Sequence, residues 1–278
     1  MRQIIVRSLL SAALAVGAAS AVAAVQHEGH AMAGDALKSA VASPARKPAN
    51  AARDAYRHPL ETLTFFGVKP SDTVVEIWPG GGWYTEILAP YLASGGGTLY
   101  AAAPDNGLGG TKKLMEANPA LYGGIKTATF PVFDGAGTPV PAGSADVVLT
   151  FRNVHNWRMG YQRDGQDYSA EAFRQIFAML KPGGTLGIVD HRLPENADAA
   201  REKSSGYIKP STIRRLAEEA GFRFAGESNV NANPKDTADH PQGVWTLPPT
   251  FALKDVDREK YVAIGESDRM TMKFVKPE

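Results

Sequence analysis

The segment from Val74 to Thr85, which reads VVEIWPGGGWYT, constrains the fold of this chain more than any other. It begins as a short apolar run rich in β-branched residues, which is typical of a buried parallel strand, and Glu76 stands near its end. The glycines that follow let the backbone approach a ligand closely, and the helix expected next points its amide groups at that ligand. The segment therefore predicts the nucleotide-sized pocket of an α/β fold. Because glycine-rich turns are common, a plain strand–turn–helix corner is the alternative.

Composition limits the class of protein. The chain has 278 residues, of which 44% are hydrophobic, and this is enough for one sizeable globular domain. The formal net charge is +1, so we expect a small-molecule substrate and no nucleic acid as partner. The absence of cysteine excludes disulfides, thiolate metal sites and cysteine nucleophiles.

The first 24 residues are typical of a secretory signal peptide. Arg2 and Arg7 supply a positive region, residues 9–19 an apolar one, and small residues offer cleavage sites up to Ala24. The apolar stretch is too short to span a bilayer comfortably, although an uncleaved anchor or a buried helix is the alternative. We expect a mature protein with no integral membrane segment, secreted or located in a bacterial periplasm.

Residues 25–50 are rich in alanine, proline and small polar types and predict a flexible tether. His27 would stand third from the new amino terminus and could chelate copper or nickel, but a plain disordered tail is the simpler interpretation. The remaining residues, 51–278, predict a single domain.

Apolar strands and amphipathic helices alternate along that domain. This order predicts a Rossmann-like, doubly wound, mostly parallel seven-stranded sheet with helices on both faces. We expect helices over residues 51–66, 83–93, 111–118, 169–180 and 210–220. We expect strands over residues 73–78, 98–103, 127–133, 146–151, 185–190, 222–227 and 270–275.

The carboxyl ends of parallel strands form the ligand-binding edge of such a sheet. Residues expected there include His155, a candidate general base, and Asp190-His191, which with His155 could form a base–orienter pair. Arg152 and Trp157 follow the same strand as His155, and Trp157 could stack on a planar ligand or only pack under a loop.

Arg192 suits a carboxylate or phosphate, because its planar group can bond two oxygens at once, although an ion pair that holds the loop is equally compatible. Residues 161–168 could form a mobile lid. The proline-rich stretch 229–254 could shape a substrate site or be a passive surface loop.

Several motifs in fixed order resemble one family. Glu76 with Gly80 and Gly82, then Asp134, then DVVL at 146–149 and LKPGG at 180–184, resemble class I S-adenosylmethionine-dependent methyltransferases. The segment 76–85, Asp190-His191-Arg192, residues 233–236 and the carboxyl-terminal residues 268–277 are similar to an exported bacterial branch of predicted methyltransferases.

The resemblance implies that S-adenosylmethionine is the cofactor and that a small acceptor is methylated. It implies that Glu76, Gly80 and Gly82 surround the methionine part and ribose of the cofactor, and that Asp134 contacts the adenine amine. From the residues alone, Asp134 is equally compatible with a turn before Gly135. The resemblance also implies that residues after the fourth strand, such as Arg152, face the substrate.

Two departures weaken the implied cofactor site. Trp78 replaces the first glycine of the turn, and Ala103 replaces the acid that binds the ribose hydroxyls. Unless Asp105 bends back to replace that acid, the affinity for the cofactor falls about tenfold to a hundredfold.

Two other functions therefore stay open. One is an exported, non-catalytic protein that binds another small ligand, which would also explain export away from the cytoplasm, where S-adenosylmethionine is made. The other is a metal-assisted hydrolase that uses His155, Asp190 and His191. These three residues lack a recognisable ligand spacing, so we predict no metal site.

Overall fold

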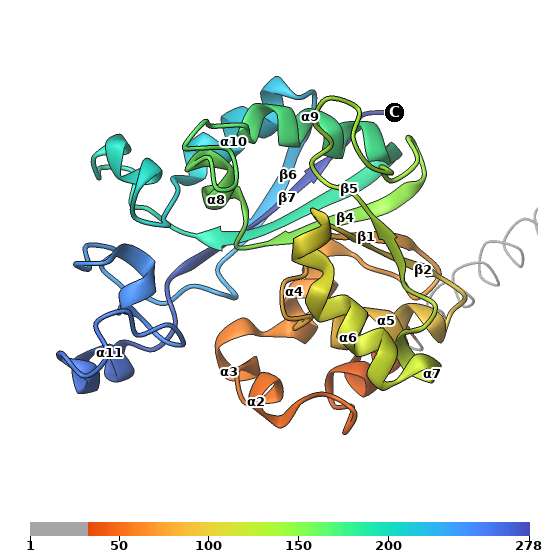
Figure 1. Ribbon diagram of the computed structural model, residues 1–278, viewed down its shortest axis with the longest axis horizontal. Coiled ribbons are helices and arrows are strands. Elements are labelled where there is room, and N and C mark those ends of the chain that lie inside the picture. Colours follow the sequence, from red (N-terminus) through yellow and green to blue (C-terminus); the bar gives the residue numbers. More distant parts are fainter. Residues whose placement is uncertain (1–32) are drawn as a thin grey trace, which may run out of the picture.

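The computed structural model describes residues 33–278 (Figure 1). The signal peptide predicted over residues 1–24 and the chelating role considered for His27 lie outside the described residues. Seven strands form one sheet in the order β3-β2-β1-β4-β5-β7-β6. They are β1 (Thr73–Ile77), β2 (Thr98–Ala102), β3 (Lys126–Ala128), β4 (Ala145–Phe151), β5 (Leu180–His191), β6 (Arg223–Ser228) and β7 (Arg269–Val275).

The sheet is mostly parallel, as predicted. Strands β3, β2, β1, β4 and β5 pair in parallel, whereas β7 runs antiparallel to both β5 and β6. Because β1 to β5 all run in one direction, their carboxyl ends lie at one edge of the sheet.

Helices cover both faces of the sheet (Figure 1). One face carries α4 (Pro59–Phe66), α5 (Thr85–Ala93), α6 (Gly109–Ala117) and α7 (Pro119–Tyr122), and the other carries α8 (Val154–Arg158), α9 (Ser169–Met179) and α10 (Pro210–Glu219). The short elements are α2 (Pro48–Ala51), α3 (Asp54–Arg57), α11 (Arg258–Ile264) and the 3-10 helices η1 (Asp105–Leu108), η2 (Ala199–Lys203) and η3 (Gly243–Thr246).

The central strand β1 is buried on both sides, which explains its unbroken apolar sequence. Val75 and Ile77 pack into a core with Phe173 and Ile176 of α9. Val74 instead belongs to the core on the opposite face, which includes helices α4 and α5. Successive residues of a strand point to opposite faces, so both cores need apolar side chains from the same short run.

Three predicted elements differ from the structure. The strand predicted over 185–190 is longer, because β5 begins at Leu180. The helix predicted over residues 51–66 is divided into α2, α3 and α4, because His58 has a left-handed backbone (φ 39°) and Pro59 begins α4. A residue before proline disfavours the helical conformation. The strand predicted over 127–133 ends at Ala128, and the backbone N–H and C=O of Val132 bond to the side chain of Gln175 instead.

The flexible tether predicted over residues 25–50 is wrong for its described part. Residues 33–41 are helical, and Leu37 and Ala40 are buried against the same core as α4 and α5. Farther on, the carboxylate of Glu86 on α5 accepts hydrogen bonds from the backbone N–H of Lys47 and the amide of Asn50. Apolar burial and these bonds fix the segment to the domain.

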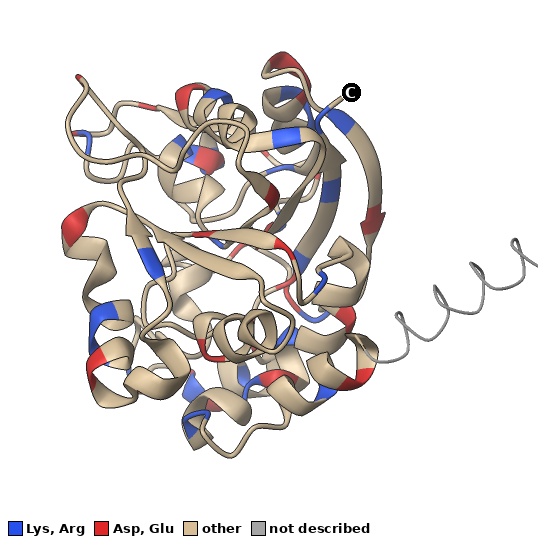
Figure 2. Ribbon diagram, turned by 90° about the vertical axis from the view of Figure 1, so that its right-hand side faces the viewer, with Lys and Arg blue, Asp and Glu red and all other residues tan. Residues whose placement is uncertain are grey.

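The surface carries both signs of charge. Lysine and arginine positions are interspersed with aspartate and glutamate positions along the ribbon in Figure 2. Within residues 33–278, no helix is both long enough and apolar enough to cross a membrane.

Candidate ligand-binding cleft

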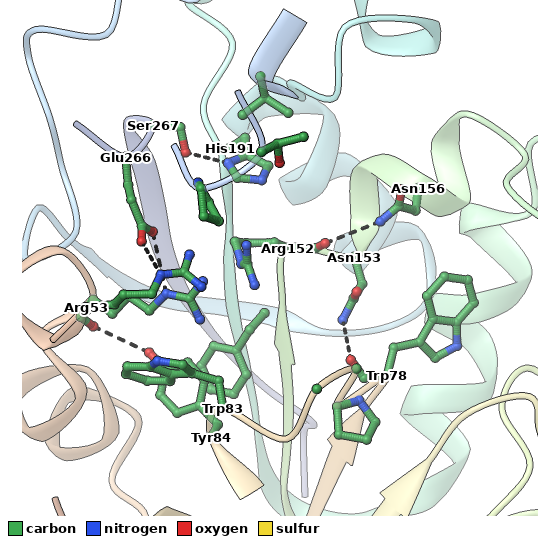
Figure 3. A pocket seen from close by; sticks show the side chains of 18 of the residues that line it. Arg53, Trp78, Trp83, Tyr84, Arg152, Asn153, Asn156, His191, Glu266 and Ser267 are labelled. Carbon is green, nitrogen blue, oxygen red and sulfur yellow. Dashed lines mark hydrogen bonds and ion pairs between the residues drawn. The ribbon is translucent and has the colours of Figure 1, made fainter. Parts of the chain in front are cut away.

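A cleft of about 370 Å³ lies at the carboxyl ends of β1, β4 and β5 (Figure 3). It is lined by the turn after β1, the residues that follow β4, the segment around α3 and two loops near the carboxyl terminus. Its polar and charged lining includes Asn50, Arg53, Arg57, Glu76, Arg152, Asn153, His155, Asn156, His191, Glu266 and Ser267.

The glycine turn after β1 is open toward this cleft. Gly80 has a φ of 59°, a conformation that favours glycine, and a Cβ added at Gly80 or Gly81 would meet no atom within 4 Å. Both glycines line the cleft. A ligand can therefore approach the backbone at these two positions.

Gly82 faces away from the cleft. Its φ is 84°, and an added Cβ would lie 2.5 Å from Cδ1 of Leu114 on α6. Gly82 therefore offers no open backbone toward the cleft, because α6 packs on that side of the turn.

Glu76 is a buried acid at the cleft. Its side chain accepts a hydrogen bond from Oγ1 of Thr85 at 2.6 Å. Burial raises the pKa of Glu76 to about 7, and the bond from Thr85 opposes this shift only in part. Near neutral pH, Glu76 therefore exists both as an acid and as a carboxylate, and it can donate or accept a hydrogen bond.

His155 is oriented by Asp190, as expected for a base–orienter pair. Nδ1 of His155 lies 2.6 Å from Oδ1 of Asp190, which also accepts the backbone N–H of His191. The other oxygen of Asp190 accepts the backbone N–H of His155. Because a carboxylate oxygen accepts, Nδ1 of His155 donates, and in the neutral ring Nε2 then carries the lone pair.

His191 completes this group. Its Nδ1 lies 2.6 Å from Oγ of Ser267, and its ring centre lies 5.0 Å from that of His155. Burial, followed by the proximity of His155, holds the pKa of His191 well below its ordinary value, so its ring is neutral.

His155, Asp190 and His191 each offer a ligand atom within 4.8 Å of the others. However, the oxygens of Asp190 already accept three N–H groups. The arrangement is better suited to orienting a base than to holding a metal ion.

Trp78 occupies the side of the cleft toward β3. Its indole Nε1 donates to the carbonyl oxygen of Phe130 at 2.9 Å, and its ring packs edge-on against Trp157 and Tyr161. Phe130 belongs to the segment after β3, which also carries Asp134. The indole therefore extends toward the segment that the family resemblance assigns to adenine.

The residues expected at the ribose and adenine lie outside the cleft lining. Ala103 is buried, and its backbone N–H bonds to Ala128. Asp105 begins η1, where its side chain is 92% exposed and pairs with Lys112 at 2.7 Å. Asp134 is exposed in a turn and has a left-handed backbone. Asp105 does not bend back, because η1 directs it to solvent.

Trp157 and Arg192, which were predicted to contact the substrate, do not line the cleft. Trp157 is fully buried and packs against Phe130 and Phe173 under the loop that follows α8. Arg192 pairs with Asp268 at 3.6 Å and lies outside the cleft lining. In both cases the structural alternative holds.

The two loops considered as parts of a site have different positions. Val244, Trp245 and residues 248–250, all within the proline-rich stretch, line the cleft. Residues 161–168 do not line it, although Tyr161 contacts Trp78.

Sequence reasoning missed the arginines of the amino-terminal segment. Arg53 and Arg57 line the cleft together with Glu266. A spacing of four residues places two side chains on one face of a helix, and this spacing was the available signal. Their partner Glu266 lies 213 residues after Arg53, so the pairing could not be read from local sequence.

Comparisons with known proteins support the fold. No protein-family profile matches the sequence, and no functionally characterised protein matches it in sequence. A solved S-adenosylmethionine-dependent methyltransferase from Aquifex aeolicus is similar in structure, with a TM-score of 0.51 and 16% identity over 66% of this chain and 88% of its own.

Two other solved structures are similar to the same extent. A phosphoethanolamine N-methyltransferase from Haemonchus contortus, solved with S-adenosylmethionine, has a TM-score of 0.52 and 16% identity over 80% of this chain and 53% of its own. The [4+2]-cyclase SpnF has a TM-score of 0.51 and 14% identity over 78% of each chain. At these identities the likeness shows the fold alone, which is that of class I methyltransferases.

Proposed function

We propose that this chain is an S-adenosylmethionine-dependent methyltransferase that acts on a small acceptor. The observation that carries the proposal is that one cleft is lined by an open glycine turn, by the buried acid Glu76 and by a histidine oriented by a carboxylate. The fold and the methyltransferases that share it support the same proposal.

His155 is the proposed general base. With Nδ1 donating to Asp190, Nε2 of His155 accepts the proton of an acceptor hydroxyl or amine in the cleft. Neutral His191, held by Ser267, adds a second polar group beside it. Positioning of the acceptor by these side chains supplies much of the remaining rate enhancement.

The described residues fit only part of S-adenosylmethionine. Glu76 and the open backbone at Gly80 and Gly81 suit the amino-acid end of the cofactor. The ribose and adenine end lacks its acid, since Ala103 has no side-chain oxygen and Asp105 faces solvent. The indole of Trp78 extends into the same region.

This mismatch favours a second candidate, a protein that binds a different small ligand in the same cleft. The solved [4+2]-cyclase has the same fold, and its name describes a reaction other than methyl transfer. We also propose, from residues 1–24 alone, that the protein is exported, which would separate it from the cytoplasm, where S-adenosylmethionine is made. Cell fractionation of the full-length protein tests the export.

Calorimetry distinguishes the two candidates. S-adenosylhomocysteine, the demethylated product, is titrated into the full chain and into a Glu76→Gln variant. Micromolar binding that weakens at least about tenfold in the variant is expected for the methyltransferase. Absence of binding at millimolar S-adenosylhomocysteine, with the protein folded, would reject the methyltransferase and favour the second candidate.

A further inference from the structure

Positive charge in the cleft exceeds the negative charge that faces it. The carboxylate of Glu266 is shared by three arginines: Nε of Arg53 at 2.5 Å, Nη2 of Arg269 at 2.5 Å and Nε of Arg57 at 3.5 Å. A single carboxylate has about four lone-pair positions, and it can neutralise only one of these guanidinium groups.

Arg57 is the group least satisfied by this arrangement. It is 2% exposed, and its Nε and Nη2 atoms are buried without a hydrogen-bond partner among the described residues. Its guanidinium lies 4.7 Å from the centre of the Trp83 ring, which holds it at the cleft. A buried charged donor without an acceptor is costly, so an acceptor from outside the chain is expected here.

Arg152 adds a third guanidinium to the cleft wall. Its backbone is left-handed (φ 64°) at the end of β4, and strained backbones of this kind concentrate at functional sites. Figure 3 shows the side chains of Arg152 and Arg53 both projecting into the cleft. Within residues 33–278, none of the ion pairs involves Arg152.

The pKa shifts of these groups agree with an excess of positive charge in the cleft. Burial, and next the repulsion from Arg152, lower the pKa of Arg57 to about 8. Burial and Arg269 lower the pKa of Arg152 to about 10. Burial alone would raise the pKa of Glu266, but Arg269, Arg53 and Arg57 lower it to about 2, so its single negative charge is present at neutral pH.

The other acids near the cleft do not fill this role. The charge of Asp190 acts on Arg152, but its oxygens already accept hydrogen bonds from His155 and from the backbone N–H of His191, and no ion pair joins it to Arg152 among the described residues. Glu76 bonds to Thr85, and its pKa is raised to about 7 by burial. The uncompensated charge is therefore left to a ligand.

We propose that Arg53, Arg57 and Arg152 form an anion-binding subsite, and that the ligand of this cleft carries a carboxylate or a phosphate group. Planar guanidinium groups bind both kinds of anion through two parallel hydrogen bonds. The subsite itself does not depend on methyl transfer. If the proposed function holds, the anionic group belongs to the methyl acceptor, and this part of the proposal alone rests on that function.

The test is calorimetric titration of the full chain with inorganic phosphate and, separately, with succinate, at constant ionic strength and without S-adenosylmethionine. Saturable binding of at least one anion is expected. A preference for phosphate or for succinate identifies which of the two groups the ligand carries. Arg152→Gln should weaken the binding about tenfold to a hundredfold, because it removes a charge-assisted hydrogen bond.

Two further variants keep the test decisive. Arg57→Lys retains the charge but not the planar fork, so it should also weaken anion binding. It replaces Arg152→Gln as the test if that variant fails to fold. Arg223→Gln removes the same charge from an exposed position on β6 and should leave the affinity unchanged.

Absence of saturable binding in the wild type, or an equal loss in Arg223→Gln, would overturn the subsite. Anion binding without any binding of S-adenosylhomocysteine would retain the subsite and reject the methyltransferase.

Discussion

Two residues of the cleft, Trp78 and Arg152, have left-handed backbones although neither is glycine. Each follows a central strand, and each is held by a backbone hydrogen bond: Trp78 donates to Ala102, and Arg152 donates to Val189. The side chain of Asn153 links the two strand ends by donating to the carbonyl oxygen of Ile77 at 2.9 Å. Neighbouring strands thus maintain strain at two positions that line the cleft.

Trp78→Gly tests whether the indole blocks the cofactor. Glycine fits the left-handed backbone, but loss of the half-buried ring should lower the free energy of unfolding by about 2 kcal/mol. The affinity for S-adenosylhomocysteine should rise at least about tenfold if the indole occupies the adenosine side. Tyr161→Ala, which removes a neighbour of the ring and leaves the ring in place, is the control. Equal affinities in wild type and Trp78→Gly would show that the indole does not obstruct binding.

Glu76→Gln tests the buried acid through the pH dependence of stability. The pKa of Glu76 is raised from 4.5 to about 7, so its stabilising contribution is complete below pH 4.5 and is lost as the pH rises through 7. Between pH 5.5 and 7.5 the wild type should lose about 2 kcal/mol relative to the variant.

Urea denaturation at both pH values measures this difference. His191, whose pKa is lowered by burial, contributes the opposite trend in both proteins, so only the comparison between wild type and variant is informative. The exposed substitution Glu227→Gln should retain the wild-type pH dependence. Identical dependence in wild type and Glu76→Gln would contradict the raised pKa.

Among the helices and strands, the position of α6 matters most for the cleft. A Cβ added at Gly110 would lie 2.1 Å from the carbonyl oxygen of Gly80, so the start of α6 touches the backbone of the glycine turn. This contact closes the turn on the side away from the cleft, and it explains why Gly82 is not available to a ligand.

Gly110→Ala should therefore force α6 and the glycine turn apart. We expect the free energy of unfolding to fall by about 2–3 kcal/mol, because the obstructing atoms belong to the backbone and cannot rotate away. Gly109→Ala is a matched control, since its φ is −57° and its added Cβ meets no atom within 4 Å. It should be neutral or stabilising by up to about 1 kcal/mol. Urea denaturation of both variants measures the difference in stability. Equal midpoints would contradict the contact between α6 and the glycine turn.

Much of the element order could be predicted from the sequence, because apolar strands and glycine-bounded helices alternate with little ambiguity. The same pattern placed Glu76, Arg152, His155 and His191 at one edge of the sheet. It could not place Asp105, because the direction of that side chain depends on η1 and on its ion pair with Lys112. Arginines that pair with a glutamate more than 200 residues later are equally beyond local reasoning.

At the scale of the whole molecule, the domain includes residues that the sequence assigned to a tether. The helix at 33–41 buries Leu37 and Ala40, and Arg46 bonds to both carboxylate oxygens of Asp54. The alanine-rich composition of residues 25–50 predicted a flexible segment, because composition does not show which few positions become buried.

Leu37→Ala should reduce the free energy of unfolding by about 2–4 kcal/mol, because it leaves a cavity between this helix and the core. Lys38→Ala, at an exposed neighbouring position, should change it by less than about 0.5 kcal/mol. Denaturation curves of the full chain measure both. If the two variants unfold at the same urea concentration, the segment does not belong to the folded domain.

The shared carboxylate of Glu266 also has a consequence for biosynthesis. Two of its arginines precede the first strand, whereas Glu266 and Arg269 stand at the start of the last strand to be made. A nascent chain that lacks this strand carries Arg53 and Arg57 without their counter-charge and has no wall on that side of the cleft. The ion pairs of Glu266 and this wall of the cleft can therefore form only after residues 266–269 have been made.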